Sequence, residues 1–260
     1  MKLSISNIAW SNENNATVYK FMQEKNFLGL EIAPTKIFPN NPYDELENAT
    51  LWKKELPFEI SSMQSIWFGR NEKIFGDSTE RETLFNYTKM AIDFAEVIGC
   101  KNLVFGCPKN RYLTENIDKN IGTEFFKQIA DYALKQKTVV GMEANPTIYN
   151  TNYINTTQEA LNLISEVDSE GFKLNLDVGT MIANEENLEI LRGKVHLMNH
   201  VHISEPFLKP IQKRNLHVEL AELLRSEGYK NFVSIEMATV DDIEIISEIM
   251  EYVRGVFGRA

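Results

Sequence analysis

Short runs of apolar and β-branched residues alternate along the chain with longer segments of helical character. In the longer segments apolar residues recur every three or four positions, as in Ala91, Phe94, Ala95 and Ile98, which is the spacing of an amphipathic helix. Regular alternation of strands and helices is typical of parallel βαβ units. The sequence predicts eight strands, over Lys2–Ile8, Leu28–Ala33, Phe58–Ser65, Asn102–Gly106, Thr138–Glu143, Phe172–Asp177, His196–Ile203 and Phe232–Met237.

The segments between these strands predict helices, and polar residues mark where several of them begin. Ser78 is suited to cap one helix, and Thr156 or Thr157 is suited to cap another. Gly99 and Gly228 fall where helices are expected to end. The clearest helices are predicted over Ser78–Ile98, Glu124–Gln136, Thr157–Val167, Asn215–Glu227 and Asp241–Val253.

The number of β/α units favours a closed barrel over a doubly wound open sheet. A doubly wound open sheet usually carries a glycine-rich phosphate turn after its first strand, and this chain has no G-x-G-x-x-G sequence. Eight β/α units in 260 residues suit a closed barrel. No linker or low-complexity tract divides the chain. The prediction is therefore an α/β protein, a single-domain (β/α)₈ TIM barrel over residues 1–260.

Composition and charge narrow the class of partner. With 43% apolar residues the chain can bury a large core, yet it has no run of about 20 apolar residues that could cross a bilayer. Two cysteines without a C-x-x-C pair, and an N-terminus unlike a signal peptide, favour a cytoplasmic protein. A net charge of −10 argues against nucleic acid as partner. We therefore expect a small-molecule substrate and no membrane partner, and the oligomeric state stays open, with a homo-oligomer among the alternatives.

Four consecutive predicted strands carry a metal-ligating residue type near their C-terminal ends: Glu143, Asp177, His202 and Glu236. In a barrel these ends meet at the face where catalytic residues gather. Residues two apart in a strand share a face, so Glu236 is expected to point inward with Ser234. A single such residue is as often structural as functional, but the pattern on four strands in succession favours a common site.

Three carboxylates and an imidazole at one barrel mouth would repel one another unless a cation lay among them. Oxygen and nitrogen ligands without thiolate suit Mn²⁺, Mg²⁺, Co²⁺ or Zn²⁺, and we expect one divalent ion per chain, with Mn²⁺ as first choice.

These residues resemble the xylose isomerase-like barrel superfamily, specifically its sugar phosphate isomerase/epimerase branch, which includes the ketose 3-epimerases. The resemblance covers nearly the whole chain. It includes Gly29-Leu30-Glu31-Ile32-Ala33-Pro34 and Leu103-Val104-Phe105-Gly106-Cys107-Pro108, together with the four strand ends.

The resemblance implies a metal held by Glu143, Asp177, His202 and Glu236, and a catalytic role for both glutamates. Glu143 and Glu236 would flank a sugar carbon on opposite faces and exchange its proton through an enediolate that the ion stabilises. The expected function is metal-dependent epimerisation or isomerisation of a sugar or sugar phosphate.

The sugar-binding positions depart from the family pattern. Thr180 stands where the family has a substrate-binding histidine, and Leu208 with Lys209 stands where it has an arginine after Glu205 of His202-Ile203-Ser204-Glu205. We still expect Glu205 and Thr180 to contact substrate. A free-ketose epimerase of the usual specificity is not expected.

Three further residues are candidates for contact with substrate. Lys109 and Arg111 follow the fourth strand and would either bind a phosphate or carboxylate or form a solvated basic loop. Trp10 lies near a strand end and would either wall the sugar pocket or pack in the core, and His200 is expected to pack or hydrogen-bond inside the barrel.

Three other functions remain possible interpretations of the sequence. Dehydration of a keto-inositol by a lyase would use the same site and the same enolate chemistry. An endonuclease IV-like DNA-repair enzyme would share the fold but would need a histidine-rich cluster of three metals, and this chain has four histidines. A non-catalytic binding barrel would not need the four ligands.

Overall fold

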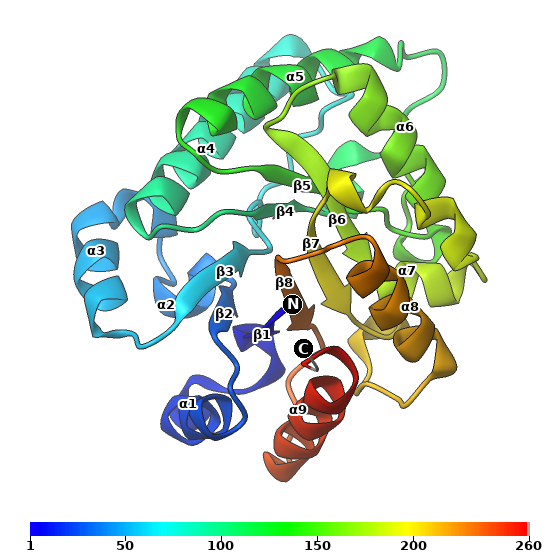
Figure 1. Ribbon diagram of the computed structural model, residues 1–260. Coiled ribbons are helices and arrows are strands. Elements are labelled where there is room, and N and C mark those ends of the chain that lie inside the picture. The colour runs from blue at the N-terminus through cyan, green and yellow to red at the C-terminus, as the bar shows by residue number, and fades with distance from the viewer. Residues whose placement is uncertain (259–260) are drawn as a thin grey trace.

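A closed barrel of eight parallel strands forms the centre of the molecule (Figure 1), as the alternating pattern predicts. The computed structural model describes residues 1–258. The strands follow one another around the barrel in chain order, and β1 closes the ring by pairing with β8. They are β1 (Lys2–Ser6), β2 (Gly29–Ile32), β3 (Glu59–Met63), β4 (Leu103–Phe105), β5 (Val140–Met142), β6 (Phe172–Asp177), β7 (Met198–Ile203) and β8 (Phe232–Ile235).

Helices surround this barrel and connect its strands. They are α1 (Asn15–Glu24), α2 (Pro34–Ile37), α3 (Leu46–Glu55), α4 (Ser78–Val97), α5 (Asn120–Lys135), α6 (Thr157–Val167), α7 (Val178–Ala183), α8 (Asn215–Ser226) and α9 (Glu244–Phe257). The prediction of a (β/α)₈ barrel is confirmed. Helices α1 and α9, from opposite ends of the chain, pack side by side (Figure 1), as expected of a closed ring.

The helix boundaries agree with the predicted ones to within a few residues, with three corrections. Helix α5 begins at Asn120, earlier than the predicted start at Glu124. The cap of α4 is Asp77 and not Ser78, because the Asp77 carboxylate accepts the Glu80 amide in a capping box. Helix α9 begins at Glu244 and runs to Phe257, later at both ends than predicted. Thr156 caps α6 as expected, and Gly99 adopts the left-handed conformation that a helix end requires.

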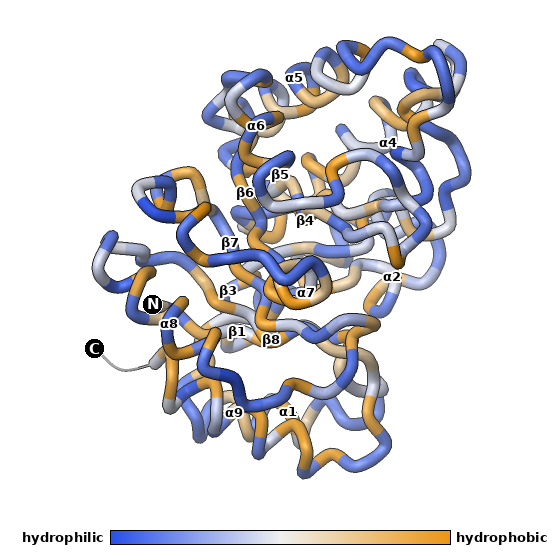
Figure 2. Tube along the Cα trace, turned by 90° about the vertical axis from the view of Figure 1, so that its right-hand side faces the viewer, coloured by the Kyte–Doolittle hydropathy of each residue, from blue (hydrophilic) through white to orange (hydrophobic). Residues whose placement is uncertain are grey.

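The apolar core lies between the strands and the inner faces of the helices. Figure 2 shows apolar and polar segments alternating along helices such as α9, whose Ile246, Ile249, Met250, Val253 and Phe257 are all buried. This three- and four-residue spacing places one stripe of α9 against the barrel. Among residues 1–258, no helix is both long and apolar enough to cross a bilayer.

The inside of the barrel is polar, which is unusual because barrel interiors are mostly filled by branched aliphatic side chains. Asn102, the residue before β4, donates through Nδ2 to Ser62 Oγ of β3 at 2.9 Å and to Asn175 Oδ1 of β6 at 3.3 Å. Hydrogen bonds therefore cross the barrel interior. Ser4 and Ser234 also lie in the interior and are fully buried. This polar interior leads up to the strand ends where the candidate site lies.

Candidate metal centre and active site

Four neighbouring strands deliver the four predicted ligands to one rim of the barrel. Glu143 directly follows β5, Asp177 is the last residue of β6, His202 is the penultimate residue of β7, and Glu236 directly follows β8. In the sheet register Asp177 lies opposite His202. Because all eight strands are parallel, these ends meet at the same rim.

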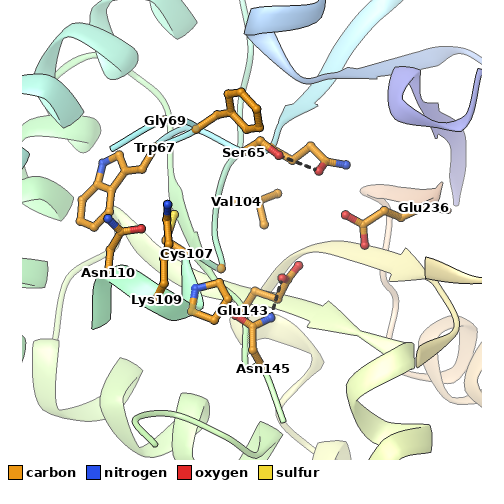
Figure 3. Close-up of a pocket in the computed structure, with 14 residues that line it drawn as sticks. Ser65, Trp67, Gly69, Val104, Cys107, Lys109, Asn110, Glu143, Asn145 and Glu236 are labelled. Carbon is orange, nitrogen blue, oxygen red and sulfur yellow. Dashed lines mark hydrogen bonds between the residues drawn. The ribbon is translucent and has the colours of Figure 1, made fainter. Parts of the chain in front are cut away.

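The imidazole of His202 brings the two glutamates together. Its Nδ1 atom lies 3.0 Å from Glu143 Oε2 and 3.1 Å from Glu236 Oε2. Ligand atoms of these three residues all lie within 4.8 Å of one another, and all three side chains are buried. Figure 3 shows the carboxylates of Glu143 and Glu236 pointing toward each other from separate strand ends, β5 and β8. Three of the four predicted ligands are therefore assembled.

The carboxylate of Glu143 is held through both of its oxygens. Asn145 Nδ2 donates to Oε1 at 3.1 Å, and Asn175 Nδ2 donates to Oε2 at 2.9 Å. Gly106 leaves room for this carboxylate, because a Cβ at that position would lie 2.8 Å from Glu143 Oε1. The amides fix the direction in which the Glu143 carboxylate points, as a proton-transfer group requires.

Asp177 lies at the same rim but points to different partners. One of its oxygens accepts both the amide and the hydroxyl of Thr180, each at 2.7 Å, and the other accepts the hydroxyl of Ser204. Asp177 is thereby the N-cap of α7. It is outside the group of three convergent ligands. The oxygen that Ser204 contacts accepts one hydrogen bond and keeps a lone pair that could contact a cation, whereas the other oxygen is occupied by the two Thr180 contacts.

Burial and mutual repulsion perturb the charges at the rim. Burial, with repulsion from Glu143 and Asp177, raises the pKa of Glu236 to about 7 against the attraction of His202. Burial and repulsion from Glu143 also raise the pKa of Asp177. Burial opposes the charged form of His202, but Glu236 and Glu31 outweigh it and raise its pKa well above the ordinary value. Each of these buried carboxylates is therefore more stable when a positive charge, such as a cation, lies beside it.

This donor set fits a divalent cation. Two carboxylate oxygens and one imidazole nitrogen converge on a common point, and a third carboxylate lies at the same rim. A cation would relieve the repulsion that raises the pKa values of Glu236 and Asp177. Such mixed oxygen and nitrogen ligation suits Mn²⁺, Mg²⁺, Co²⁺ or Zn²⁺.

We predict that the affinity for a divalent ion rises with pH through neutrality. Metal binds the deprotonated carboxylate, so a proton competes at Glu236 below its pKa of about 7. Each displaced proton makes the apparent affinity change by about tenfold per pH unit below that pKa. Calorimetric titration with Mn²⁺ at several pH values, in buffers of different ionisation enthalpy, measures both affinity and proton release. Glu236→Gln should flatten the dependence, and an unchanged affinity in the native protein from about pH 5.5 to 8 would contradict the prediction.

A cavity of about 540 Å³ opens beside the two glutamates and is large enough for a small ligand. Glu143, Glu236 and Asn145 form one side of it (Figure 3). Segments after β3 and β4 form the rest, and they contribute Trp67, Phe68 and Lys109. The two acid/base candidates therefore face a space that a substrate can enter.

The two basic residues after β4 lie in different surroundings. Lys109 is exposed and lines the cavity (Figure 3), and its Nζ atom donates to Asn71 Oδ1 at 3.4 Å. Arg111 is fully buried, and its guanidinium donates to Glu143 O and Asn145 Oδ1, each at 2.8 Å. All of these hydrogen bonds lie inside the protein, and Arg111 does not line the cavity. The structure therefore does not place Arg111 in contact with a substrate, as the sequence had suggested. Lys109 remains a candidate for contact with a substrate anion.

The other predicted substrate contacts are also engaged within the protein. The carboxylate of Glu205 is buried and binds the guanidinium of Arg214 through both oxygens, at 2.8 and 2.5 Å. Thr180 Oγ1 lies 2.8 Å from Ala144 O and 2.7 Å from Asp177 Oδ2, two acceptors that share its one hydroxyl proton. Trp10 is fully buried, and its indole donates to Asn15 Oδ1 at 2.8 Å. None of these three side chains lines the cavity, so the packing alternative for Trp10 is the one observed.

Sequence reasoning missed several residues that shape the site. Asn145 and Asn175 hold Glu143, and the signal for Asn175 was its position two residues before Asp177 on the same strand face. Glu31 on β2 is fully buried and lies 2.8 Å from His202 Nε2. Although burial acts to raise the pKa of Glu31, His202 and His200 outweigh it and hold that pKa below its usual range. Its signals in the sequence were a charged residue within an apolar strand and its place in the Gly29-Leu30-Glu31-Ile32 run that carries the family resemblance, and neither indicated a contact with His202.

The family model described as xylose isomerase-like TIM barrel matches residues 27–255. The chain is similar in structure to 3-keto-D-glucoside 4-epimerase from E. coli, with 20% identity, a TM-score of 0.76, and coverage of 98% of this chain and 99% of that one. It is also similar to D-psicose 3-epimerase from Clostridium cellulolyticum H10, with 17% identity, a TM-score of 0.80, and coverage of 99% of each chain. A third similar structure is the IolI protein with a bound zinc atom, with 15% identity, a TM-score of 0.76, and coverage of 100% of each chain. No curated protein matches this chain in sequence. At these identities the structural similarities establish the fold.

Proposed function

The chain belongs to the xylose isomerase-like TIM barrel family, and we propose that it is a metal-dependent epimerase or isomerase of a sugar or sugar phosphate. One observation supports the proposal above the others. Glu143 and Glu236 both contact His202 Nδ1, and both line the same cavity. Two carboxylates beside one cavity are what proton removal from one face of a carbon and proton return to the other face require.

Glu143, Asp177, His202 and Glu236 would hold the ion, with Mn²⁺ as first choice. The bound ion would supply Lewis acidity to a substrate carbonyl. One glutamate, as carboxylate, takes the proton from the carbon beside that carbonyl, and the electron pair of the broken C–H bond forms an enediolate. The other glutamate, as carboxylic acid, returns a proton to that carbon from the far side, so the two groups exchange protonation states. Isomerisation instead returns the proton to the former carbonyl carbon, while the hydroxyl proton of the neighbouring carbon moves to the former carbonyl oxygen.

The substrate class rests on the relatives as well as on the cavity. The names of two similar structures describe epimerases of a keto-glucoside and of a ketose, which supports a sugar as the first candidate substrate. The cavity is bordered by the exposed ring of Phe68 and by cationic Lys109, whereas Trp67 beside them is buried and its indole donates to Thr88 Oγ1. Aromatic faces pack against the C–H faces of sugars, and a lysine beside them suits an anionic substituent.

Incubation with candidate ketoses, keto-glycosides and their phosphates in D₂O, with Mn²⁺ or with a chelator, tests the proposal. We expect metal-dependent incorporation of deuterium next to the carbonyl, together with an epimer or isomer of the substrate. Loss of water with an enone product would indicate the keto-inositol lyase instead. Metal binding without deuterium incorporation in any substrate of these classes would favour a binding barrel.

We predict that Lys109 matters only for anionic substrates. Lys109→Ala removes the exposed cation that lines the cavity and leaves the buried guanidinium of Arg111 in place. KM for a sugar phosphate should rise by about tenfold, the equivalent of roughly 1.4 kcal/mol, while KM for the free sugar stays within about twofold. Lys20→Ala, an exposed lysine on α1, is the matched control. Equal changes for both substrates would remove the idea of a phosphate contact.

A further inference from the structure

We propose that Glu31 is a positioning residue for the metal centre. Its carboxylate binds Nε2 of His202 and thereby orients the imidazole so that Nδ1 faces the ion. The inference rests on the proposed function, because it assigns a role to a residue outside the expected ligand set. Glu31 comes from β2, on the other side of the barrel from the β5 and β6 ligands (Figure 1).

The two nitrogens of His202 face different groups. Nε2 lies 2.8 Å from Glu31 Oε2, whereas Nδ1 lies 3.0 Å from Glu143 Oε2 and 3.1 Å from Glu236 Oε2. Both His202 and Glu31 are fully buried, so no solvent competes for either nitrogen. When Nε2–H donates to Glu31, the lone pair of a neutral imidazole is left on Nδ1, the nitrogen that faces the convergent carboxylates.

Glu31 is itself fixed by its neighbours inside the barrel. Gln64 Nε2 donates to its Oε1 atom at 3.2 Å, and His200 Nε2 lies 3.0 Å from its Oε2 atom. A fully buried carboxylate is costly unless it is paired, and a serine or an aliphatic residue would fill a barrel interior without that cost. The arrangement of carboxylate, histidine and metal is a general device that orients the ring and raises its basicity.

The same atoms allow a competing assignment, a second ion held by Glu31, His200 and His202. That ion would take His202 Nε2 while the first ion took Nδ1, so the ring would have to lose both of its protons. Nδ1 faces two carboxylates that line the cavity, whereas Nε2 faces the single, fully buried carboxylate of Glu31, so the ion is better placed at Nδ1 and the proton at Nε2. The geometry therefore favours positioning over a second ion.

The first test measures ion affinity in Glu31→Gln, which keeps the shape and removes the charge. We expect Zn²⁺ and Mn²⁺ to bind about 10- to 100-fold more weakly, as for other partners of ligating histidines. KM for the sugar should not change when the metal is saturating, because Glu31 does not line the cavity. Ser4→Ala is the matched control, since Ser4 is equally buried in the barrel interior and its hydroxyl has no partner among the described residues. Affinity of Glu31→Gln within about twofold of the native protein overturns the inference.

The second test uses the native protein, so it holds even if Glu31→Gln does not fold. In ¹⁵N-labelled, Zn²⁺-loaded protein we expect a proton on His202 Nε2 that is protected from exchange, and a metal-shifted Nδ1 without a proton. Protonation at Nδ1, or uptake of two ions per chain, overturns the inference while the proposed function stands. Absence of any ion uptake by the native protein overturns both.

Discussion

Replacing either Glu143 or Glu236 by glutamine is expected to lower turnover by at least about 10²-fold, the effect typical of a lost acid/base group. Glutamine keeps the size and one oxygen but cannot take up a proton from carbon. Both side chains line the cavity, so the loss acts on the reacting atoms themselves. Steady-state rates on the true substrate, with metal content measured in each variant, check the prediction.

The two variants should also separate the faces of the substrate. A variant that keeps its ion but loses turnover should still exchange deuterium from one face in D₂O, and the face identifies the remaining base. Glu219→Gln, an exposed glutamate on α8, is the control and should leave the rate unchanged. If both cavity variants keep their metal and near-normal rates, the two-glutamate mechanism is wrong for this protein.

Replacing Arg111 by leucine is expected to destabilise the protein on the order of 3 kcal/mol or more. The guanidinium donates to Glu143 O, Asn145 Oδ1 and Ile154 O, and the variant removes these donors; Ile154 O keeps the Asn145 amide, whereas Asn145 Oδ1 and Glu143 O lose the Arg111 bond. An unsatisfied buried polar group costs about 1–3 kcal/mol. Because Asn145 in turn holds Glu143, activity should fall as well in the folded fraction.

Urea denaturation measures this cost, and Lys109→Ala provides the contrast from the same turn. Lys109 is exposed, so its removal should change the free energy of unfolding by no more than about 0.5 kcal/mol. Similar losses for the two variants would mean that Arg111 does not hold the loop under Glu143.

This pair of residues shows where prediction from the sequence ends. Lys109 and Arg111 are two positions apart and chemically alike, so the sequence predicts one role for both. The turn of 3₁₀ helix over Pro108–Arg111 places Lys109 outward and Arg111 against the β5 strand end. Which cation meets solvent depends on that turn, and its shape is set by packing.

The strands were predictable because each one is a short buried run bounded by polar residues. Helices α1 and α3 were not among the clearest predicted helices for a physical reason: α1 buries only Val18 and Met22, and α3 buries only Ala49, so their apolar stripes are weak. Boundaries such as the start of α9 depend on local capping and loop contacts, which periodicity does not report.

The rim residues were predictable because a closed parallel barrel brings all strand ends to one face. That rule places Glu143, His202 and Glu236 together but does not decide side-chain partners, and Asp177 turns to Thr180 and Ser204. Glu31 could not be assigned to the site from sequence, because its contact with His202 crosses the barrel interior between strands far apart in the chain.

Elemental analysis of the purified protein after equilibration with Mn²⁺, Co²⁺ or Zn²⁺ tests the central claim most directly. Ligand atoms of Glu143, His202 and Glu236 converge at one point, with Asp177 at the same rim. We expect about one ion per chain in the native protein, near-complete loss of the ion in His202→Ala, and weakened binding in Asp177→Asn. A native protein that stays metal-free with all three ions, or a His202→Ala variant that binds as tightly as the native protein, would contradict the account.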